Sequence, residues 1–399
     1  MQTLAPKYDP LDPAVLENPY AAYAELRRAT RVCRCGPGQW AVTRYADVAA
    51  LLRDPRLGHH FPDVYYRFLL GDGDASLFFQ RIIMDRDPPD HTRLRHLLNK
   101  SFAPSLIRRL TDRIEDMVGR LVNEAADRRG FDAVNDLAVP LPFLVICELL
   151  GVPSSSRDDV WPHVALLSKA FDTHTPETER PAIDQAVVWL RDFFRVLLDE
   201  RRSQPTDDLI SHMSTAITGP MALDRDEIID NAVFLFFAGF ETTTNLIGNG
   251  CAALLEYPQA FARLREEPAL ATLAVEEFLR YDAPVQSVSR LVLQPIEIGD
   301  RIIKKDRVLV LLLGSANHDE RQFPDPTRLD IGRTPNPHLS FAGGIHYCLG
   351  ATLARLEATA VFTRLAQRFT ALEAGGEIVR RPSAGFRAYS QVPIIATVA

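Results

Sequence analysis

The chain has 399 residues, 24% of them charged and 46% hydrophobic, which is the balance of a soluble globular protein. Its formal net charge of −7 excludes bulk attraction to nucleic acid. No apolar run follows a basic N-terminal region, and the apolar run 232–240 is too short to cross a bilayer. We therefore expect neither a signal peptide nor a membrane anchor.

The five cysteines are scattered, which does not predict a disulfide framework and is typical of a protein in the reducing cytoplasm. Cys33 and Cys35 are close together, but no second pair follows them, so the spacing does not indicate a zinc site. The sequence has no internal repeat and no low-complexity linker. Length alone suggests two or three domains.

Short elements are predicted in the first part of the chain. The pattern of apolar residues predicts helices over 20–28 and 45–53 and strands over 31–35 and 39–43. The stretch 58–84 is rich in aromatic residues and is predicted to be irregular. Its residues 71–74 form a turn that lacks the further ligands of a calcium loop.

Helical periodicity dominates residues 90–214. Asp90 is a candidate cap for a helix that contains His91, Arg95 and Leu98. Further helices are predicted over 106–126, over the almost wholly apolar 141–150, and twice within 160–202 with breaks near Pro176 and Pro181.

A long helix is predicted to begin at a capping box of Asp224 and Glu227 and to end near residue 255. Its middle carries Gly239, Glu241 and Thr242 within an apolar run. One interpretation is close packing at the glycine, with threonine hydroxyls bonded to backbone carbonyls. The other is a helix that opens to admit a small ligand, with an acid beside an alcohol to deliver protons.

A shorter helix predicted over 270–281 places Glu277 and Arg280 on one face. Such a pair is usually a surface ion pair of small effect. Strands are predicted over 287–292, 295–298 and 308–313. Residues 319–337 are a proline-rich coil that is longer than an ordinary connection.

The proline-rich coil leads to residues 341–350, which place Cys348 between a glycine-bearing loop and a helix predicted over 351–366. The helix dipole and unpaired N–H groups favour thiolate, so we expect the pKa of Cys348 to lie below the roughly 8.5 of a free cysteine. A thiolate here can act as a nucleophile or bind a soft metal centre. The alternative is a buried cysteine after a turn.

Together, and in this order, these motifs resemble the cytochrome P-450 superfamily of haem-thiolate monooxygenases, over residues 20–393. The cysteine loop departs from the family pattern F-G-x-G-x-H-x-C-x-G only at Ala342. The matching residues are Phe341, Gly344, His346, Cys348 and Gly350 for this loop, Ala238, Gly239, Glu241 and Thr242 for A-G-x-[DE]-T, Glu277 and Arg280 for E-x-x-R, and His91 and Arg95 for H-x-x-x-R.

The resemblance implies haem b (iron protoporphyrin IX) as cofactor, with Cys348 as the thiolate ligand of the iron. Phe341 would pack near the sulfur, and Gly344 and Ala238 would lie close to the porphyrin. The residues implied to hold the two haem propionates are His91, Arg95, Arg290 and His346.

The resemblance also implies a buried ion pair between Glu277 and Arg280 that joins the helix to the proline-rich coil. Arg328 and Arg333 both qualify as its third partner. Thr242 would hydrogen-bond dioxygen or an attendant water, and Glu241 would relay protons.

Several separate stretches are expected to line an apolar pocket for a lipophilic substrate. The candidate residues are Phe237, Val285, Val288 and Phe386. Similar sequences belong to bacterial pathways that tailor polyketides, macrolides and peptides, so the resemblance implies a role in secondary metabolism and antibiotic biosynthesis. The residues leave open whether the substrate is a free small molecule or is tethered to a carrier protein.

The chain has no flavin or iron–sulfur motif, so the resemblance implies ferredoxin and ferredoxin reductase as electron donors. Such electron donors are usually acidic, so we expect a basic patch on this chain that binds the donor. The alternative for each candidate residue is that it lies on an ordinary solvated face. The candidates are Arg93, Lys100, Arg108 and Arg109. We expect no nucleic-acid or membrane partner, and a monomer.

Three functions are open at this point: insertion of one oxygen atom by hydroxylation or epoxidation, oxidative coupling or ring formation on the same scaffold, and haem binding without turnover. The Glu241–Thr242 pair favours the first, because oxygen activation needs protons. The expected fold is mainly α with a minor β part near the N-terminus. It is one triangular P-450 domain over residues 1–399, with haem between the long central helix and the helix after the cysteine loop.

Overall fold

The computed structural model describes residues 6–101, 104–128, 130–172, 175–215 and 223–399. The chain forms two compact units, each assembled from separate stretches of sequence. Unit 1 is Met1–Gly58, Asp116–Pro140 and Thr242–Ala399, and unit 2 is His59–Glu115 and Leu141–Glu241. Two long helices, α7 (Pro104–Arg128) and α12 (Arg225–Glu256), contribute residues to both units. The single domain expected over residues 1–399 stays a prediction.

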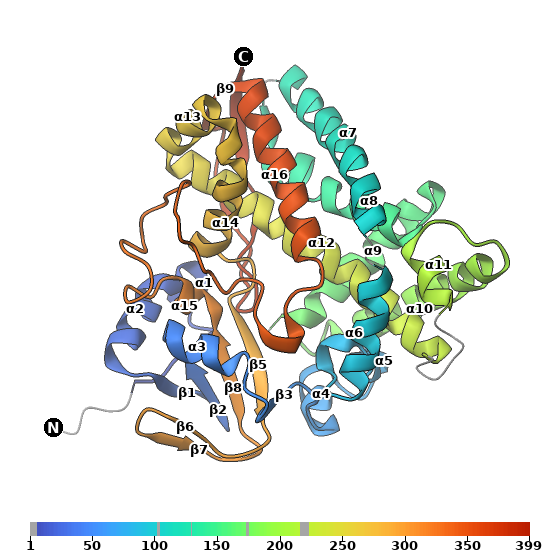
Figure 1. Ribbon diagram of the computed structural model, residues 1–399, viewed down its shortest axis with the longest axis vertical. Helices are drawn as coiled ribbons and strands as arrows, with labels where there is room; N and C mark the ends of the chain where they lie inside the picture. The colour runs from blue at the N-terminus through green and yellow to red at the C-terminus, as the bar shows by residue number, and fades with distance from the viewer. Residues whose placement is uncertain (1–5, 102–103, 129, 173–174, 216–222) are drawn as a thin grey trace. The chain divides into compact units, whose positions relative to one another are not determined.

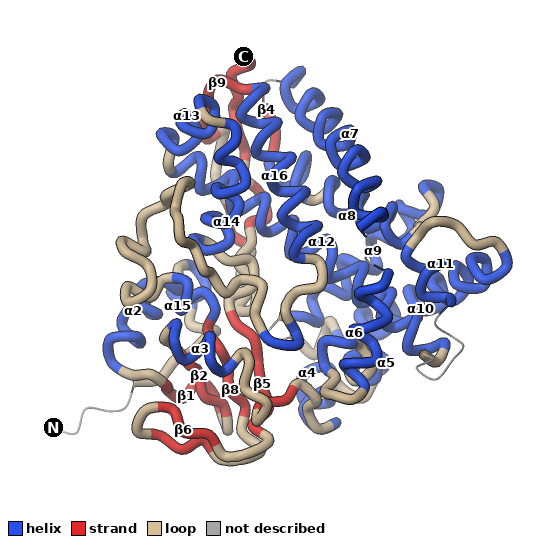
Figure 2. The backbone as a smooth tube through the Cα atoms, in the orientation of Figure 1, coloured by secondary structure: helices blue, strands red, loops and turns tan. Residues whose placement is uncertain are grey.

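Unit 1 contains all the β-strands of the described residues, together with several helices (Figure 2). Its strands are β1 (Val32–Gly36), β2 (Gln39–Val42), β3 (Leu57–Gly58), β4 (Gly130–Asp132), β5 (Ser287–Val292), β6 (Ile296–Ile298), β7 (Arg301–Ile303), β8 (Val308–Leu312), β9 (Phe369–Ala374), β10 (Val379–Arg380), β11 (Tyr389–Gln391) and β12 (Pro393–Val398). Its helices are α1 (Pro13–Glu17), α2 (Pro19–Ala29), α3 (Tyr45–Leu51), η2 (Ala133–Ala138), α13 (Pro258–Glu266), η6 (Pro268–Leu270), α14 (Ala271–Tyr281), α15 (Leu313–Asn317), η7 (Gly344–His346) and α16 (Ala351–Arg368).

The main sheet of unit 1 has five strands in the order β1-β2-β8-β5-β3. In Figure 1 it joins the blue N-terminal strands to the orange strands from later in the chain. Strands β2 and β8 run parallel, with Gln39 opposite Val308 and Val42 opposite Leu311, and the other pairs are antiparallel. Buried valine and leucine side chains of this sheet and of α3, together with isoleucine side chains of β6 and β7, form one hydrophobic core. This core is the support on which the strand carrying Arg290 rests.

Three smaller sheets complete the β part of unit 1. One has the order β4-β12-β9, and the others are the pairs β10-β11 and β6-β7. The C-terminal strand β12 lies between β4 and β9, so it pairs with segments from the middle and from the end of the chain. The expectation of a mainly α protein with a minor β part is confirmed.

Unit 2 is wholly helical in the described residues. Its elements are α4 (Asp63–Leu70), α5 (Asp74–Phe79), η1 (Ile83–Asp85), α6 (Asp90–Ser101), α8 (Pro140–Leu150), η3 (Ser154–Ser156), α9 (Arg157–Ser168), η4 (Lys169–Phe171), α10 (Arg180–Ser203) and α11 (Leu209–Ser214). The two helices predicted within 160–202 are confirmed as α9 and α10, and the interruption near Pro176 and Pro181 separates them. Pro181 lies in the first turn of α10, where proline is well tolerated.

The prediction that residues 58–84 are irregular is wrong, because they contain the helices α4 and α5. Both are short, and short helices depend on tertiary contacts more than on the propensity of their own residues. The backbone N–H of Ala75 donates to Asp184 of α10 at 2.8 Å. Arg180, also of α10, donates to the carbonyl of Phe68 at 3.3 Å. The partners that stabilise these helices lie more than 100 residues away, where a local pattern cannot show them.

The capping box predicted for α12 is confirmed. The backbone N–H of Asp224 donates to Glu227 Oε2 at 3.0 Å, and that of Glu227 donates to Asp224 Oδ1 at 2.7 Å. The stretch Ala133–Leu150 is long and apolar enough to be a membrane span by composition, but 67% of it is buried inside the protein. That degree of burial is typical of a core segment.

Candidate functional site

The cysteine loop of unit 1 runs from Phe341 through η7 to the first turn of α16. The N–H of Cys348 donates to the carbonyl of Phe341 at 3.1 Å, which closes the loop. Gly350 is the N-cap of α16, so the half-buried Cys348 lies just before the N-terminus of this helix, as the sequence predicted. The depressed pKa expected for its thiol stays a prediction.

Two residues of this loop have left-handed backbone conformations. Gly344 has φ +69°, and a Cβ at this position would lie 2.5 Å from the carbonyl oxygen of Leu52. Ala342 has φ +57°. An L-residue in this region costs roughly 1–2 kcal/mol. The alanine that departs from the family motif therefore adopts the kind of conformation that glycine adopts freely, and the methyl group is held at some cost in strain.

Phe341 is surrounded by a cluster that sequence reasoning missed. The guanidinium of Arg355 lies 4.4 Å from the Phe341 ring centroid, and the His338 ring is 5.9 Å away. Glu276 accepts from Arg355 at 2.6 and 2.9 Å and contacts His338 Nε2 at 3.0 Å. Burial alone would raise the pKa of Glu276, but hydrogen bonds from Arg355 and His338 lower it to about 2. The one signal in the sequence was a second acid directly before Glu277.

The E-x-x-R pair is buried, and not a surface pair. Glu277 and Arg280 are both inaccessible to solvent, and two N–H groups of Arg280 donate to the carboxylate at 2.8 Å. The third partner is Arg333, whose Nε lies 3.2 and 3.1 Å from the two oxygens of Glu277. Arg328 supplies only its backbone carbonyl, to Arg280 at 3.2 Å. The ion pair therefore joins α14 to the proline-rich coil, as the resemblance implied.

The four residues expected at haem propionates divide equally between the units. In unit 1, Arg290 is a buried residue of β5, and His346 is a half-buried residue of η7. In unit 2, His91 and Arg95 lie one turn apart on α6, and His91 is only 2% exposed. The pKa of His91 is lowered to about 4 by burial and by the nearby charge of Arg95.

The middle of α12 combines a structural glycine with the expected proton-transfer pair. A Cβ on Gly239 would lie 2.6 Å from Ile146 Cδ1, so this glycine allows α8 to pack closely against α12. Thr244 donates to the carbonyl of Ala138 at 2.9 Å. These contacts support close packing at the glycine. Glu241 is 4% exposed and is followed by the half-buried Thr242, an arrangement that leaves the proton-delivery interpretation open as well.

The candidate pocket residues fall into two groups. In unit 1, Val285 and Phe386 face each other as a β-bridge, and both Val285 and Val288 pack against the core of the main sheet. In unit 2, Phe237 is 3% exposed and stacks on Phe171 of η4 with ring centroids 3.8 Å apart. The sequence did not identify Phe171. All four candidates are apolar, as a lipophilic ligand requires.

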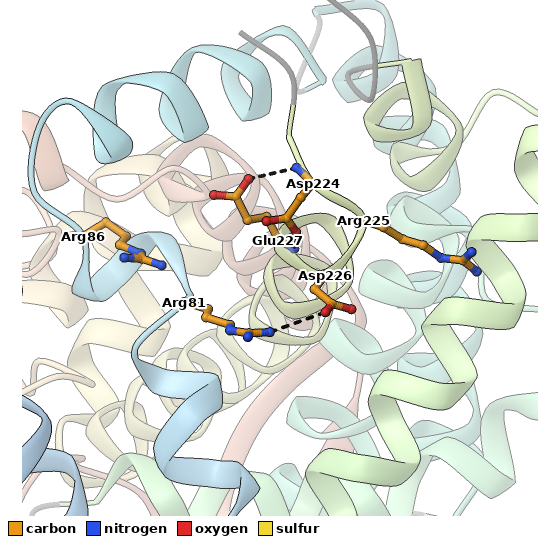
Figure 3. A pocket seen from close by; sticks show the side chains of 6 residues that line it. All are labelled: Arg81, Arg86, Asp224, Arg225, Asp226 and Glu227. Atoms are coloured by element: carbon orange, nitrogen blue, oxygen red, sulfur yellow. Dashed lines mark hydrogen bonds and ion pairs between the residues drawn. The ribbon is translucent and has the colours of Figure 1, made fainter.

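Unit 2 also contains a cavity of about 450 Å³ at the N-terminus of α12 (Figure 3). Its lining residues are Arg81, Arg86, Asp224, Arg225, Asp226 and Glu227. In Figure 3 the carboxylate of Glu227 reaches the backbone of Asp224, and Arg81 reaches toward Asp226. An entirely charged lining does not suit a lipophilic molecule, so this cavity is not a candidate for the substrate pocket.

Two of the four residues expected to form a basic patch for an electron donor are paired with acidic residues. Arg93 donates to Glu227 at 2.9 Å, and Arg109 forms an ion pair with Asp207. Both cations thus have acidic partners within unit 2, which reduces the positive field they present. The side chains of Lys100 and Arg108 lie outside the described residues.

The residues of unit 1 fit haem b in two respects. Cys348 offers a single sulfur ligand beside a helix N-terminus. One protein ligand is enough for haem iron, because the porphyrin supplies the ligands in its own plane. Arg290 is 3% exposed, and a buried guanidinium can form strong charge-assisted hydrogen bonds with a carboxylate such as a haem propionate.

Comparison with known proteins agrees with this fit. A sequence profile described as Cytochrome P450 matches residues 163–385. The 6-deoxyerythronolide B hydroxylase of Saccharopolyspora erythraea is 35% identical over 391 residues, which cover 94% of this chain and 95% of that protein. The polyketide biosynthesis cytochrome P450 PksS of Bacillus subtilis is 34% identical over 89% of this chain and 88% of that protein.

A solved structure gives the same result for the fold. P450BioI in complex with an acyl carrier protein ligated to hexadec-9Z-enoic acid has a TM-score of 0.90 and 33% identity, and the match covers 96% of this chain and 100% of that one. Identity of this level over nearly the full length of both chains shows common family membership. The chain therefore belongs to the cytochrome P450 family, whose members are haem-dependent monooxygenases that receive electrons from redox partners.

Proposed function

We propose that this protein is a monooxygenase that hydroxylates or epoxidises a lipophilic natural product in secondary metabolism. The observation that carries the proposal is the closed loop that presents Cys348 at the start of α16. The haem, when bound, supplies oxygen activation: one atom of O2 enters the substrate, and the other leaves as water with two electrons and two protons. The remaining tasks fall to side chains of this chain.

In this proposal the chain holds the cofactor through several separate contacts. Cys348 would bind the iron as thiolate, and Phe341, which carries Arg355 over its ring, would screen the sulfur from water. Gly344 and Ala238 would lie against the porphyrin. The propionates would be held by His91, Arg95, Arg290 and His346.

Proton delivery is assigned to Glu241 and Thr242 on α12. Glu241 is buried, and its carboxylate can pass a proton between solvent and the hydroxyl of Thr242. The Thr242 hydroxyl would accept this proton while donating its own toward the reacting oxygen. Because the two residues are adjacent on one continuous helix, their spacing is fixed by the backbone.

The substrate is assigned to the class of lipophilic natural products, on the basis of the apolar candidates Phe237, Val285, Val288 and Phe386. The likeness to PksS and to 6-deoxyerythronolide B hydroxylase supports this class. The likeness to P450BioI bound to an acyl carrier protein supports a substrate tethered to a carrier protein. Electrons come from a ferredoxin and its reductase, and we place the enzyme in the cytoplasm as a monomer.

The first test is the carbon monoxide spectrum of the reduced holoenzyme. A Soret band at the thiolate-ligated position is expected, and a band at a histidine-ligated position would remove Cys348 as the ligand. Spin-state titration with free polyketides and with their carrier-bound thioesters then identifies the substrate. Product analysis with a surrogate ferredoxin system separates oxygen insertion from oxidative coupling.

The proton-delivery role predicts a loss of coupling in Thr242→Ala. Product formed per electron pair should fall at least about ten-fold, with peroxide released instead, because a positioned proton donor typically contributes that much or more. Thr244→Ala is the matched control, since it removes the same hydroxyl from the same helix but breaks only a bond to the Ala138 carbonyl. Equal coupling in the two variants would contradict the role of Thr242.

A further inference from the structure

A buried carboxylate directly after α14 ties together parts of unit 1 that are far apart in sequence. Asp282 is 6% exposed. Its Oδ1 accepts from the hydroxyl of Tyr20 at 2.7 Å and from Nε of Arg387 at 3.2 Å. Its Oδ2 accepts from Nη1 of Arg380 at 3.0 Å. Each oxygen of the carboxylate is therefore engaged by a donor from a different part of the chain.

The charges of this cluster are well defined. Burial alone would raise the pKa of Asp282, but Arg387, Arg380 and the Tyr20 hydroxyl lower it below its usual value. Burial and the adjacent carboxylate raise the pKa of Tyr20 well above its ordinary value. Asp282 is therefore the anion and Tyr20 a neutral donor, and the hydrogen bond between them is charge-assisted.

The carboxylate lies where two expected pocket segments meet. Residues 283–288 follow Asp282 directly, and residues 384–389 contain Arg387. The N–H of Arg387 donates to the carbonyl of Pro284 at 2.9 Å, and the N–H of Gln286 donates to the carbonyl of Gly385 at 3.1 Å. The bridge between Val285 and Phe386 lies between these two bonds. The relative position of the two side chains is thus set by a short backbone pairing that the carboxylate holds at one end.

Two further parts of the chain also hold Asp282 and Arg387 in place. The amide Nδ2 of Asn249, on α12, donates to the carbonyls of both Asp282 and Arg387 at 2.9 Å. Arg387 also donates to the backbone carbonyls of Leu16 and Glu17, at 3.2 and 2.8 Å. The cluster therefore connects the first helices, α12, the end of α14 and the C-terminal segment.

We propose that Asp282, with Tyr20 and Arg387, is a positioning residue of the substrate pocket that holds Val285 and Phe386 side by side and so selects which molecules bind. The proposal rests on the proposed function, which assigns these two side chains to the pocket wall. Asp282 touches neither substrate nor cofactor in this role. It acts through the backbone pairing, because binding selectivity depends on how firmly the residues around a site hold its wall in place.

The test compares Tyr20→Phe with Tyr23→Phe in the purified holoenzyme. Both residues lie on α2, and both variants lose one phenolic hydroxyl. The hydroxyl of Tyr20 donates to Asp282 and accepts from Nε2 of Gln286 at 3.3 Å, whereas that of Tyr23 binds the hydroxyl of Tyr8 at 3.4 Å. Dissociation constants are measured by Soret shift for two probes, imidazole and 4-phenylimidazole. Imidazole is too small to test the pocket wall, so the ratio of the two constants reports on the wall alone.

We expect the ratio for Tyr20→Phe to differ from wild type by about five-fold, the lower end of the effect typical of coupled sites. The ratio for Tyr23→Phe should equal that of wild type. Arg380→Met, which removes another donor to the same carboxylate from a partly exposed position, should shift the ratio in the same direction as Tyr20→Phe. The ratio of the two dissociation constants can be measured in Arg380→Met even if Tyr20→Phe does not retain haem.

Thermal unfolding separates positioning from plain stability. An unchanged ratio in Tyr20→Phe and Arg380→Met, with lower unfolding temperatures, would overturn the proposal and leave the cluster a structural one. Equal shifts of the ratio in Tyr20→Phe and Tyr23→Phe would also overturn it. The carbon monoxide spectrum of the wild type tests Cys348 separately, so failure of the proposed function is visible before the azole comparison is made.

Discussion

Two buried carboxylates lie five positions apart at the end of α14, and they are held in opposite ways. Glu277 is paired with Arg280 of its own helix and with Arg333 of the coil that leads to the cysteine loop. Asp282 is paired with residues 20, 380 and 387, near the two ends of the chain. The arginine partners of Glu277 lie 3 and 56 positions away in the sequence, whereas the partners of Asp282 lie 98 to 262 positions away, although both clusters contain one acid and two arginines.

The difference shows what each cluster does for the molecule. Arg280 also donates to the carbonyls of Asn317 and Pro326, at 3.0 and 2.8 Å, so the Glu277 cluster fixes the irregular coil before Cys348. The Asp282 cluster fixes the two segments that carry Val285 and Phe386. The first supports the proposed cofactor side of unit 1, and the second supports the proposed substrate side.

The largest effect is expected from Arg280→Met. Breaking a fully buried ion pair typically costs about 4 kcal/mol, and here Glu277 would keep only Arg333 as a cation while the carbonyls of Asn317 and Pro326 lose their donor. We expect urea unfolding to show this loss, and haem retention after gel filtration to fall with it.

The control for Arg280→Met is Arg195→Met. Arg195 and Asp192 have the same i,i+3 spacing, but their side chains are 40% and 62% exposed, so the loss should stay below about 1 kcal/mol. Similar losses in the two variants would show that the E-x-x-R pair does not stabilise the fold through burial.

A smaller loss of stability, with a clear change in the pocket, is expected from Asp282→Asn. The amide can still accept from Tyr20, but Arg387 is left without a counter-ion at 5% exposure, which should cost about 3 kcal/mol. Unlike Arg280→Met, this variant should change the ratio of the 4-phenylimidazole and imidazole dissociation constants. Asp300→Asn is the control, because its carboxylate is 88% exposed. A normal ratio in Asp282→Asn would break the distinction drawn between the two clusters.

The smallest expected effect is a pH dependence. The pKa of Asp282 is lowered from 3.8 in the folded protein, so its carboxylate stabilises the fold above that pH and loses this contribution as the pH falls below it. The stability difference between wild type and Asp282→Asn should therefore be full at neutral pH and shrink below about pH 4. Urea unfolding midpoints measured down to about pH 2 test this, and a difference that grew with acidity would have the wrong sign.

Local patterns in the sequence were enough to predict the long helices and the Glu277 pair. Helix period and the i,i+3 spacing act within a few residues, so they are visible in any window that contains them. The choice between Arg328 and Arg333 was not predictable, because the coil around them has no period. The helices α4 and α5 were missed for a related reason: their stabilising partners, Arg180 and Asp184, lie on α10.

In the candidate site, too, the features within one short motif were predictable and the contacts between distant segments were not. Cys348, His346 and Gly344 fall within one short motif, so the sequence placed them on one loop. Glu276 and Arg355 come from separate helices, and their contact at 2.6 Å needed the folded chain to bring them together. The left-handed conformation of Ala342 was hidden for another reason, since alanine does not by itself predict a positive φ.

The bonds from Arg387 to the carbonyls of Leu16 and Glu17 join residues about 370 positions apart. During synthesis the first helices leave the ribosome long before their partner exists. The segment 283–288 likewise cannot pair with residues 384–389 until that part of the chain has been synthesised. The wall of the proposed pocket is therefore among the last parts of the chain that can assemble, because residues 384–389 must be synthesised before it can form.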